Sequence, residues 1–322
     1  MNYKLFGANT GLYASEVVLG ASNFGTRKGY GATPEESTKI LSAYQEAGGN
    51  IIDISDLYQL GEAEEIVGGF LKNKRNDFII CSKYTKSSEV NPAISNYGNH
   101  RKSMKQAVET SLKRLKTEYI DIYMPHFDDG KTPMYEIIRG LEDLVKEGKV
   151  LYTGLTNFPA WKVASIASLT NLTALQIEYN LLQRTADREF LPMAEEFGLA
   201  TMMYSPLAGG VLTGKYRNGE SGRINLGSDA EYKEDQKTKT IIDKLIAIGK
   251  EINATAGQVA FAWVLSKNAF PLIGARKISH FQESLKAAHI KLTEEHIIDL
   301  DNLSKVALGY PHDLLATVRN AT

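Results

Sequence analysis

The chain has 322 residues, 43% of them hydrophobic, and 37 Lys and Arg residues stand against 38 Asp and Glu residues. A net charge this close to zero argues against a partner that binds mainly through charge, such as duplex nucleic acid. The one cysteine, Cys81, excludes a disulfide framework and a multi-cysteine metal site, and it fits a reducing compartment.

Two features concern targeting. The first residues lack the apolar core of a signal peptide. The longest purely apolar run, 259–265, is far shorter than the roughly 20 residues that a membrane-spanning helix needs. We therefore expect a soluble, cytoplasmic protein with neither a membrane nor a nucleic-acid partner.

Short apolar segments rich in β-branched and aromatic residues recur along the chain. Helical periodicity fills the intervals between them, for example at 103–115 and 134–146. Strands that alternate with helices indicate a parallel sheet, and continuous apolar runs suit strands that are buried on both faces. The predicted strands begin near Val17, Ile51, Phe78, Tyr119, Val150, Ala174, Ala200 and Pro271.

This strand pattern predicts an α/β protein with a (β/α)8 TIM barrel, a fold that typically takes about 250 residues. A doubly wound sheet is the competitor, but no Gly-x-Gly-x-x-Gly follows the first strands. We also expect an N-terminal β-hairpin, at 3–6 and 11–14, that covers the bottom of the barrel. The polar, Gly- and Ser-rich segment 214–239 predicts an inserted loop over the barrel mouth. No linker or repeat suggests a second domain, so residues 1–322 are expected to form a single domain.

Polar residues follow three successive predicted strands. Asp53 ends the second run, Lys83 the third and His126 the fourth, and Tyr58 comes five residues after Asp53. Each of them alone has an ordinary structural explanation, such as a helix cap for Asp53 or an ion pair for Lys83. Because a barrel carries its function at the C-terminal ends of its strands, the four together favour an active site.

The chemistry of this set is proton transfer by a tyrosine. A free tyrosine titrates near ~10, and the Lys83 ammonium is expected to lower the pKa of Tyr58 by roughly 1–3 units. Asp53 would keep Lys83 charged and in place, and His126 would donate to the substrate oxygen or relay a proton with it, and fix its orientation. The set suits protonation of an oxygen as hydride arrives at the adjacent carbon. It does not suit hydrolysis, because neither a nucleophile elbow nor a second carboxylate is at hand.

Longer stretches of the sequence resemble the aldo-keto reductase superfamily. The similar segments are 53–58, 61–64, 82–83, 119–126, 148–158, 175–180, 204–216 and 273–276, and 98–102 resembles the aryl-alcohol dehydrogenase-like branch. The resemblance implies an NADPH-dependent oxidoreductase that reduces aldehydes or ketones to alcohols by hydride transfer. It also implies that Asp53, Tyr58, Lys83 and His126 form the catalytic tetrad, with Tyr58 as the proton donor.

The resemblance further implies where NADPH or NADP+ binds. Thr156, Asn157 and Gln176 would hold the nicotinamide carboxamide, and Tyr204 would stack on the ring. The pyrophosphate would lie along Ser205, Pro206, Leu207, Gly209, Leu212 and Lys215, and the adenosine end along Gly274, Arg276, His280, Glu283 and Ser284. Many relatives carry other residues where this chain has His280 and Ser284. Arg276 and Lys277 could pair with a 2′-phosphate, which favours NADP over NAD, or they could be solvated charges.

The substrate is expected to be a small carbonyl compound, with aromatic aldehydes as the first candidates. Phe24, Tyr84 and Phe127 adjoin the catalytic strand ends and could line an aromatic pocket or simply pack at the barrel rim. One alternative function is a nicotinamide-binding redox sensor or regulatory subunit, as in the potassium-channel β-subunits that resemble this family. Another is a cofactor-independent lyase or isomerase, which would leave the inserted loop and the Arg276 segment unexplained.

Two other patterns lead to functions that the sequence does not support. Residues 209–215 read Gly-x-x-x-x-Gly-Lys, as in a phosphate-binding loop, but Tyr216 stands where Ser or Thr would bind magnesium. The six histidines show no pair with a carboxylate at the spacing of metal ligands. We therefore expect neither nucleotide hydrolysis nor a metal site.

Overall fold

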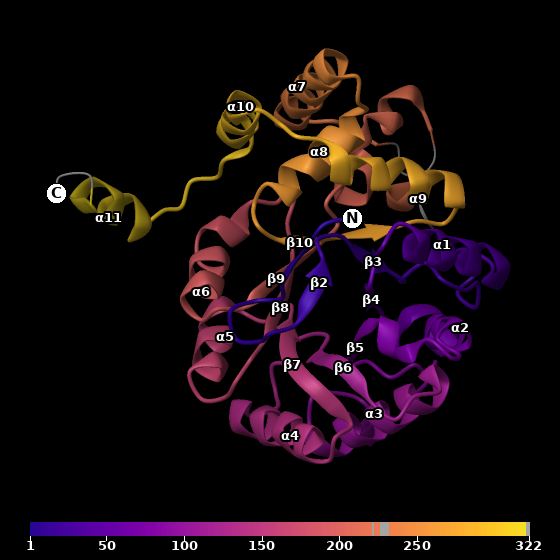
Figure 1. Ribbon diagram of the computed structural model, residues 1–322. Helices are drawn as coiled ribbons and strands as arrows, with labels where there is room; N and C mark the ends of the chain where they lie inside the picture. Colours follow the sequence, from indigo (N-terminus) through magenta and orange to yellow (C-terminus); the bar gives the residue numbers. More distant parts are fainter. Residues whose placement is uncertain (221, 226–231, 320–322) are drawn as a thin grey trace.

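The computed structural model describes residues 1–220, 222–225 and 232–319. Its parallel strands close into a barrel in the order β10-β3-β4-β5-β6-β7-β8-β9, with helices around the outside (Figure 1). The predicted (β/α)8 barrel is thus confirmed. The strands are β3 (Val18–Gly20), β4 (Ile51–Asp53), β5 (Ile79–Tyr84), β6 (Ile120–Pro125), β7 (Val150–Thr156), β8 (Ala174–Glu178), β9 (Ala200–Tyr204) and β10 (Phe270–Gly274).

Several of the helices begin after a residue whose side chain accepts a hydrogen bond from a free backbone N–H group. Thr33 accepts a hydrogen bond from the Glu36 N–H, and Thr255 forms a capping box with Gln258. The helices are α1 (Pro34–Glu46), α2 (Glu62–Phe70), α3 (Arg101–Leu115), α4 (Met134–Lys146), α5 (Ala160–Ala167), α6 (Phe190–Glu196), α7 (Gln236–Ile252), α8 (Ala256–Leu265), α9 (Ile278–Leu285), α10 (Glu294–Ser304) and α11 (His312–Arg319).

Short 3-10 turns join several of these elements. They span Tyr58–Gly61, Arg75–Asp77, Ile94–Asn96, Thr185–Asp187, Ala208–Thr213, Lys215–Asn218, Arg223–Asn225 and Lys286–His289. The last helix, α11, extends away from the barrel (Figure 1). The longest apolar run of the sequence lies in α8, where residues 259–264 are buried. No helix in the described ranges is long and apolar enough to cross a membrane.

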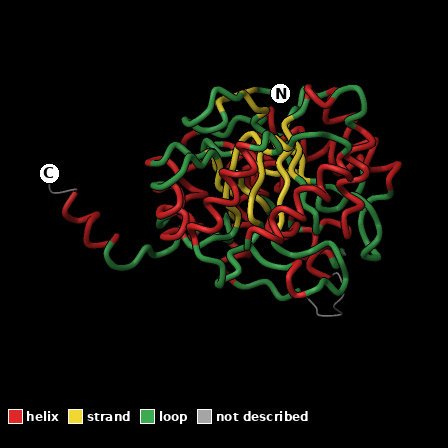
Figure 2. The backbone as a smooth tube through the Cα atoms, turned by 90° about the horizontal axis from the view of Figure 1, so that it is seen from below, coloured by secondary structure: helices red, strands yellow, loops and turns green. Residues whose placement is uncertain are grey.

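The predicted N-terminal hairpin is confirmed. β1 (Tyr3–Leu5) pairs antiparallel with β2 (Tyr13–Ser15). Phe6, directly after β1, is fully buried, and its ring centroid lies 5.0 Å from that of Phe270 at the start of β10. Phe6 also shares an apolar cluster with Val18 and Ile51, the first residues of β3 and β4. The hairpin therefore closes the end of the barrel at which the strands begin, as Figure 2 shows.

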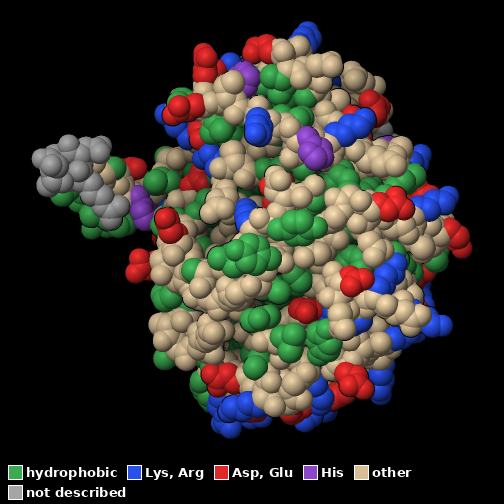
Figure 3. Space-filling model, in the orientation of Figure 1, with side chains coloured by type: hydrophobic (Ala, Val, Ile, Leu, Met, Phe, Trp, Pro, Cys, Tyr) green, Lys and Arg blue, Asp and Glu red, His purple; other side chains and the backbone are tan. Residues whose placement is uncertain are grey.

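The outer surface of that end differs from the rest of the molecule. In Figure 3, the charged side chains gather toward the edge of this face, while its middle is mostly neutral. Tyr3, Leu5 and Tyr13 of the hairpin are each about half exposed. On this face, the charged side chains therefore lie mainly toward the surrounding helices and not over the hairpin.

The predicted inserted loop at 214–239 is too long at its C-terminal end. Helix α7 begins at Gln236, because the Asp235 side chain accepts the Thr238 N–H at 2.7 Å and caps the helix. Residues 221 and 226–231 of that prediction lie outside the described residues. Burial raises the pKa of Tyr204, at the end of β9, to about 12, and the charge of Arg223 opposes this rise.

Candidate active site

The strand register brings three of the predicted catalytic residues to the same end of the barrel. Asp53 is the last residue of β4 and pairs with Cys81 of β5, two residues before Lys83. Lys83 pairs in turn with Met124 of β6, two residues before His126. Tyr58 opens the 3-10 turn that follows β4. Because β4, β5 and β6 lie side by side in chain order, their C-terminal ends bring these residues together.

The centre of the site is a buried ion pair. Lys83 Nζ donates to Asp53 Oδ1 at 2.6 Å and to the Ile54 carbonyl at 3.0 Å, and both charged side chains are at most 2% exposed. The same Nζ lies 5.2 Å from the centroid of the Tyr58 ring. The Tyr58 and His126 rings meet edge to face, 5.7 Å apart. The structure therefore brings together all four residues of the predicted tetrad.

The surroundings of Lys83 determine its protonation state. Burial disfavours the ammonium, but the Asp53 carboxylate, together with Tyr58 and Cys81, outweighs burial and raises the pKa of Lys83. Lys83 is therefore a fixed positive charge beside the Tyr58 phenol.

The prediction that Lys83 brings the pKa of Tyr58 below its ordinary value is wrong. Burial raises the pKa of Tyr58 to about 12, and the Lys83 charge offsets only part of this rise. The sequence shows the ammonium but not the loss of water around the phenol, which is the larger effect here. Tyr58 consequently holds its proton at neutral pH, which is the state that a proton donor needs.

His126 is a neutral imidazole. Burial lowers its pKa to about 2, and the charges of Lys83, Lys86 and Lys28 act in the same direction. Its Nδ1 lies 3.1 Å from Ser55 Oγ. A neutral imidazole carries one N–H, so the nitrogen that bears it depends on this contact.

Sequence reasoning missed Ser55 and its neighbour Asp56. Both are buried in the turn between Asp53 and Tyr58, and Ser55 touches His126. Their position at a strand end, inside the segment that carries two tetrad residues, is the signal that could have found them.

Three of the residues predicted for the nicotinamide end lie against the tetrad. Gln176 Nε2 donates to Asp53 Oδ1 at 2.7 Å, and the Tyr204 hydroxyl donates to Asn157 Oδ1 at 2.8 Å. Asn157 Nδ2 donates to the carbonyl of His126 at 3.1 Å. Gln176 and Asn157 are therefore held by residues of the predicted tetrad, and Tyr204 is held by Asn157.

Thr156 is placed differently from its neighbour Asn157. It is fully buried, and its hydroxyl contacts the sulfur of Met124 at 3.2 Å. In this structure, the Thr156 hydroxyl is therefore engaged with the barrel interior.

The loop after β9 has an unusual backbone. Ser205, Ala208, Gly209 and Gly210 all have positive φ, between 49° and 96°. A Cβ on Gly210 would lie 3.0 Å from Cε and 3.3 Å from Nζ of Lys215, so the missing side chain lets Lys215 lie against the loop. Successive backbone N–H groups in turn conformations can form concave sites for anions. Of the other predicted residues here, Pro206 and Leu212 are buried, and Leu207 is half-buried.

The predicted adenosine residues lie along the end of β10 and helix α9. Arg276 and Ser284 are half-buried, whereas Gly274, His280 and Glu283 are exposed. The N–H of Ile278, the first residue of α9, donates to Glu36 Oε1 at 2.7 Å. Because β10 pairs with β9, this segment lies on the same side of the barrel mouth as Tyr204.

The three predicted substrate residues differ in exposure. Phe24 and Tyr84 are fully buried in the core, and the Tyr84 hydroxyl donates to the Asn99 carbonyl at 3.2 Å. Phe127 is half-buried and stacks on the His126 ring at 4.3 Å. Of the three, Phe127 is the one that offers open surface beside the tetrad.

Within the described residues, no group of three or more His, Cys, Asp or Glu side chains is arranged to hold a metal ion.

The chain matches the Aldo/keto reductase family over residues 16–305. An NADP(+)-dependent aryl-alcohol dehydrogenase of Phanerodontia chrysosporium is 32% identical, over 94% of this chain and 86% of that protein. A norsolorinic acid reductase of Aspergillus flavus is 31% identical, over 97% and 84% of the two chains. A Saccharomyces cerevisiae protein whose name assigns it to the aryl-alcohol dehydrogenases is 32% identical, over 97% and 89%. The chain therefore belongs to the aldo/keto reductase family of oxidoreductases, in its aryl-alcohol dehydrogenase-like branch.

Proposed function

We propose that this protein is an NADPH-dependent carbonyl reductase that converts aldehydes or ketones to alcohols, with Tyr58 as the proton donor. The observation that carries the proposal is the buried Lys83–Asp53 pair, 2.6 Å long, beside the rings of Tyr58 and His126. A fixed cation next to a protonated phenol serves a reaction in which an oxygen gains negative charge and then a proton.

Each member of the tetrad has one task in this reaction. The substrate oxygen accepts hydrogen bonds from the Tyr58 hydroxyl and from the His126 imidazole. As negative charge grows on that oxygen, the Tyr58 proton moves to it. The Lys83 ammonium stabilises the phenolate that remains, and Asp53 keeps Lys83 charged and oriented. Aromatic aldehydes are the first candidate substrates, because Phe127 lies stacked on His126 at the mouth.

The residues at the other side of the mouth fit a nicotinamide dinucleotide. Gln176, Asn157 and Tyr204 would hold the nicotinamide ring next to the tetrad, since their side chains already bond to Asp53, to one another and to His126. The loop 205–210, four of whose residues have positive φ, and Lys215 would receive the pyrophosphate, and Arg276 the 2′-phosphate. When bound, the cofactor supplies the hydride.

The test is Tyr58→Phe, which removes the proton donor and keeps the ring. We expect the variant to bind NADPH, measured by fluorescence titration, and to lose nearly all oxidation of NADPH by 4-nitrobenzaldehyde. The matched control is Tyr119→Phe, because the Tyr119 hydroxyl bonds to Asn76 on the surface, before β6 begins.

Aldehyde reduction by Tyr58→Phe at the wild-type rate would overturn the role of Tyr58. Binding of NADPH by the wild type without turnover of any carbonyl compound would instead favour a redox sensor or regulatory subunit. If neither NADPH nor NADH binds, the proposed function fails.

A further inference from the structure

Behind His126, several polar groups converge on one hydroxyl. Ser55 Oγ lies 3.1 Å from His126 Nδ1 and 3.1 Å from Asp56 Oδ1, and it lies 3.4 Å from the Lys83 carbonyl. It also accepts the Leu57 N–H at 3.2 Å. Ser55 is fully buried, and Asp56 and His126 are 4% and 8% exposed. Water therefore has little access to these contacts.

A serine hydroxyl has one proton to donate and two lone pairs to accept with. The Leu57 N–H takes one lone pair, so one donor and one acceptor position remain for Asp56 and His126 together. The Lys83 carbonyl, farther away at 3.4 Å, can only accept, and when the Ser55 hydrogen goes to it, either Asp56 or His126 is left without a bond to Ser55. Two arrangements bond Ser55 to both Asp56 and His126. If Asp56 is ionised, Ser55 donates to Asp56, and His126 Nδ1–H donates to Ser55. If Asp56 is protonated, it donates to Ser55, and Ser55 donates to a bare His126 Nδ1.

The two arrangements give Nε2 of His126, the nitrogen that would contact the substrate, opposite hydrogen-bonding roles. In the second, the ring proton is on Nε2, which can donate to a substrate oxygen. In the first, the ring proton is on Nδ1, and Nε2 can only accept. A carbonyl oxygen has no proton to give, so only the second arrangement assists carbonyl reduction.

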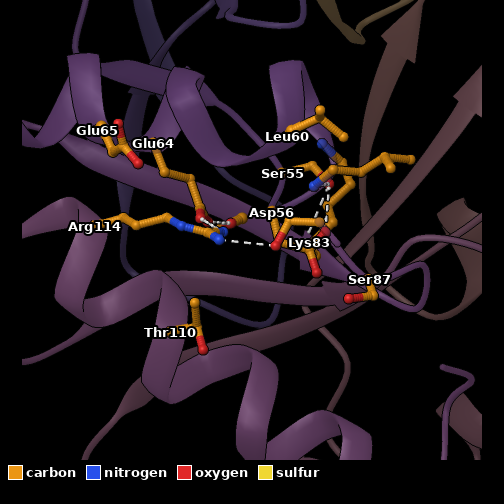
Figure 4. A network of polar contacts seen from close by, with 12 residues as sticks. Ser55, Asp56, Leu60, Glu64, Glu65, Lys83, Ser87, Thr110 and Arg114 are labelled. Carbon is orange, nitrogen blue, oxygen red and sulfur yellow. Dashed lines mark hydrogen bonds and ion pairs between the residues drawn. The ribbon is translucent and has the colours of Figure 1, made fainter. Parts of the chain in front are cut away.

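The surroundings of Asp56 favour its protonated form. Its carboxyl lies near Glu64, whose Oε2 is 3.3 Å from Arg114 Nη1 (Figure 4). Arg114 also donates to Ser88. Burial and the Glu64 charge raise the pKa of Asp56 well above its usual range, although Ser55, the Leu57 N–H and Arg114 oppose this. The titratable and charged groups that face Asp56 from the packed elements are Lys28, Glu64, Lys83, Tyr84, Lys86, Glu89, Arg114, Tyr123 and, through Ser55, His126.

Asp56 also has a route to solvent that does not pass through the barrel mouth. It lines a cleft of about 90 Å³ between the segment after β5 and helix α3, together with Ser87, Thr110 and Arg114. The cleft is polar and large enough for ordered water. Neither Ser55 nor His126 lines it. Asp56 can therefore exchange its proton with solvent while the active site is occupied.

We propose that Asp56 is a positioning residue that acts through Ser55 to set the tautomer of His126, so that protonated Asp56 keeps the donor hydrogen on Nε2. The inference rests on the proposed reductase function for its catalytic meaning. Loss of the Asp56 proton to the cleft moves the Ser55 proton toward Asp56 and the ring proton from Nε2 to Nδ1. One proton leaves the protein, and the fold is unchanged.

The direct test is NMR of the full-length protein labelled with 15N-histidine. Two-bond 1H–15N correlations show which ring nitrogen carries the hydrogen, and the His126 signals are assigned with His126→Asn. As the pH is raised across the range in which the protein stays folded, we expect the wild type to move from Nε2–H to Nδ1–H when Asp56 loses its proton. Asp56→Asn is expected to stay Nε2–H throughout, because its amide donates to Ser55 permanently.

An unchanged tautomer in the wild type across this range overturns the proposal, and so does a pH response in Asp56→Asn like that of the wild type. The wild-type titration needs no variant, so the test stands even if Asp56→Asn does not fold. Ser55→Ala breaks the connection and is expected to abolish the pH response. Glu89→Gln, which removes another carboxylate from the cleft, is the control and should titrate like the wild type.

Kinetics give an independent measurement. Above the pKa of Asp56, kcat/KM for aldehyde reduction in the wild type is expected to fall about tenfold per pH unit, as for one essential protonated group. Asp56→Asn should keep the rate that the wild type shows at low pH. If no carbonyl compound is reduced but the tautomer still responds, the proposed function fails while the coupling stands. If the wild type and Asp56→Asn both reduce the aldehyde with the same pH profile, the coupling between Asp56 and His126 is overturned, and the proposed function stands.

Discussion

The two sides of the barrel mouth are built in different ways. At the ends of β4, β5 and β6, the polar side chains are buried and bonded to one another, and the Lys83–Asp53 pair is at most 2% exposed. At the ends of β9 and β10, Lys215 and Arg276 are half-buried, and the loop backbone takes left-handed conformations. The first side holds its charges in a fixed place, whereas the second presents backbone and long cationic side chains that can adapt to a ligand.

This difference separates two kinds of residue in one site. Buried groups that orient one another are part of the folded core, so changing them alters both stability and chemistry. Partly exposed groups contribute little to folding, and changing them alters binding. Substitutions on the first side should therefore reduce stability and turnover together, and those on the second should weaken cofactor binding alone.

The largest effect is expected from Lys83→Met. It leaves the Asp53 carboxylate buried without its cation, and removal of one partner of a buried pair costs about 3–5 kcal/mol. Urea unfolding should show a loss of this size in the free energy of unfolding, together with loss of aldehyde reduction.

Lys105→Met is the control for this substitution. Lys105 pairs with Glu147 on the surface at 3.2 Å, with side-chain exposures of 62% and 35%. Exposed pairs contribute about 0–1 kcal/mol. Equal losses of stability in Lys83→Met and Lys105→Met would contradict the view that the buried side of the mouth is part of the folded core.

A smaller effect is expected from acid acting on His126. Burial lowers the pKa of His126 to about 2, so below the ordinary value of about 6.5 the unfolded chain binds a proton that the folded protein does not. The contribution of His126 to stability is therefore complete above pH 6.5 and is lost as the pH falls below it, by about 1.4 kcal/mol per pH unit.

Urea unfolding of the wild type and of His126→Gln, from about pH 7 to about pH 5, measures this loss. The variant should lose correspondingly less stability on acidification, because it has no imidazole to titrate at this position. Identical pH dependence in the two proteins would show that His126 is not held neutral by burial.

The smallest effect is expected from a substitution on the second side of the barrel mouth, where β9 and β10 end. Arg276→Ala is expected to weaken NADPH binding about tenfold, or about 1.4 kcal/mol, and to leave NADH binding nearly unchanged, because only NADPH carries the 2′-phosphate. Stability should change by no more than about 0.5 kcal/mol. Lys286→Ala, an exposed change just after α9, is the control in the fluorescence titration. An equal loss for both cofactors would remove the phosphate role of Arg276.

Much of the architecture could be predicted because parallel barrel strands are buried on both faces. Such strands stand out as apolar runs, and the observed starts at Val18, Ile51, Ile79 and Ile120 lie within one residue of the predicted ones. The grouping of the predicted tetrad could be foreseen for a related reason, since Asp53, Lys83 and His126 lie at or next to the C-terminal ends of β4, β5 and β6.

The remaining features depend on three-dimensional surroundings. The pKa of Tyr58 is set by how much water its phenol loses, which no local pattern records. The burial of Tyr84 depends on its stacking with Tyr123 of the next strand, at 5.3 Å. Ser55 matters because it meets His126, which is distant in sequence. The end of the inserted loop depends on a single cap at Asp235.

The N-terminal hairpin has a consequence for how ligands enter and leave the barrel. Phe6 and Phe270 begin an apolar plug that continues up the barrel through Ile79 and Cys81, and Cys81 lies beside Asp53. The barrel is thus closed at the end where its strands begin, and this apolar cluster excludes water from that side. Ligands enter and leave by the same opening, so the one that lies deeper must arrive first and depart last.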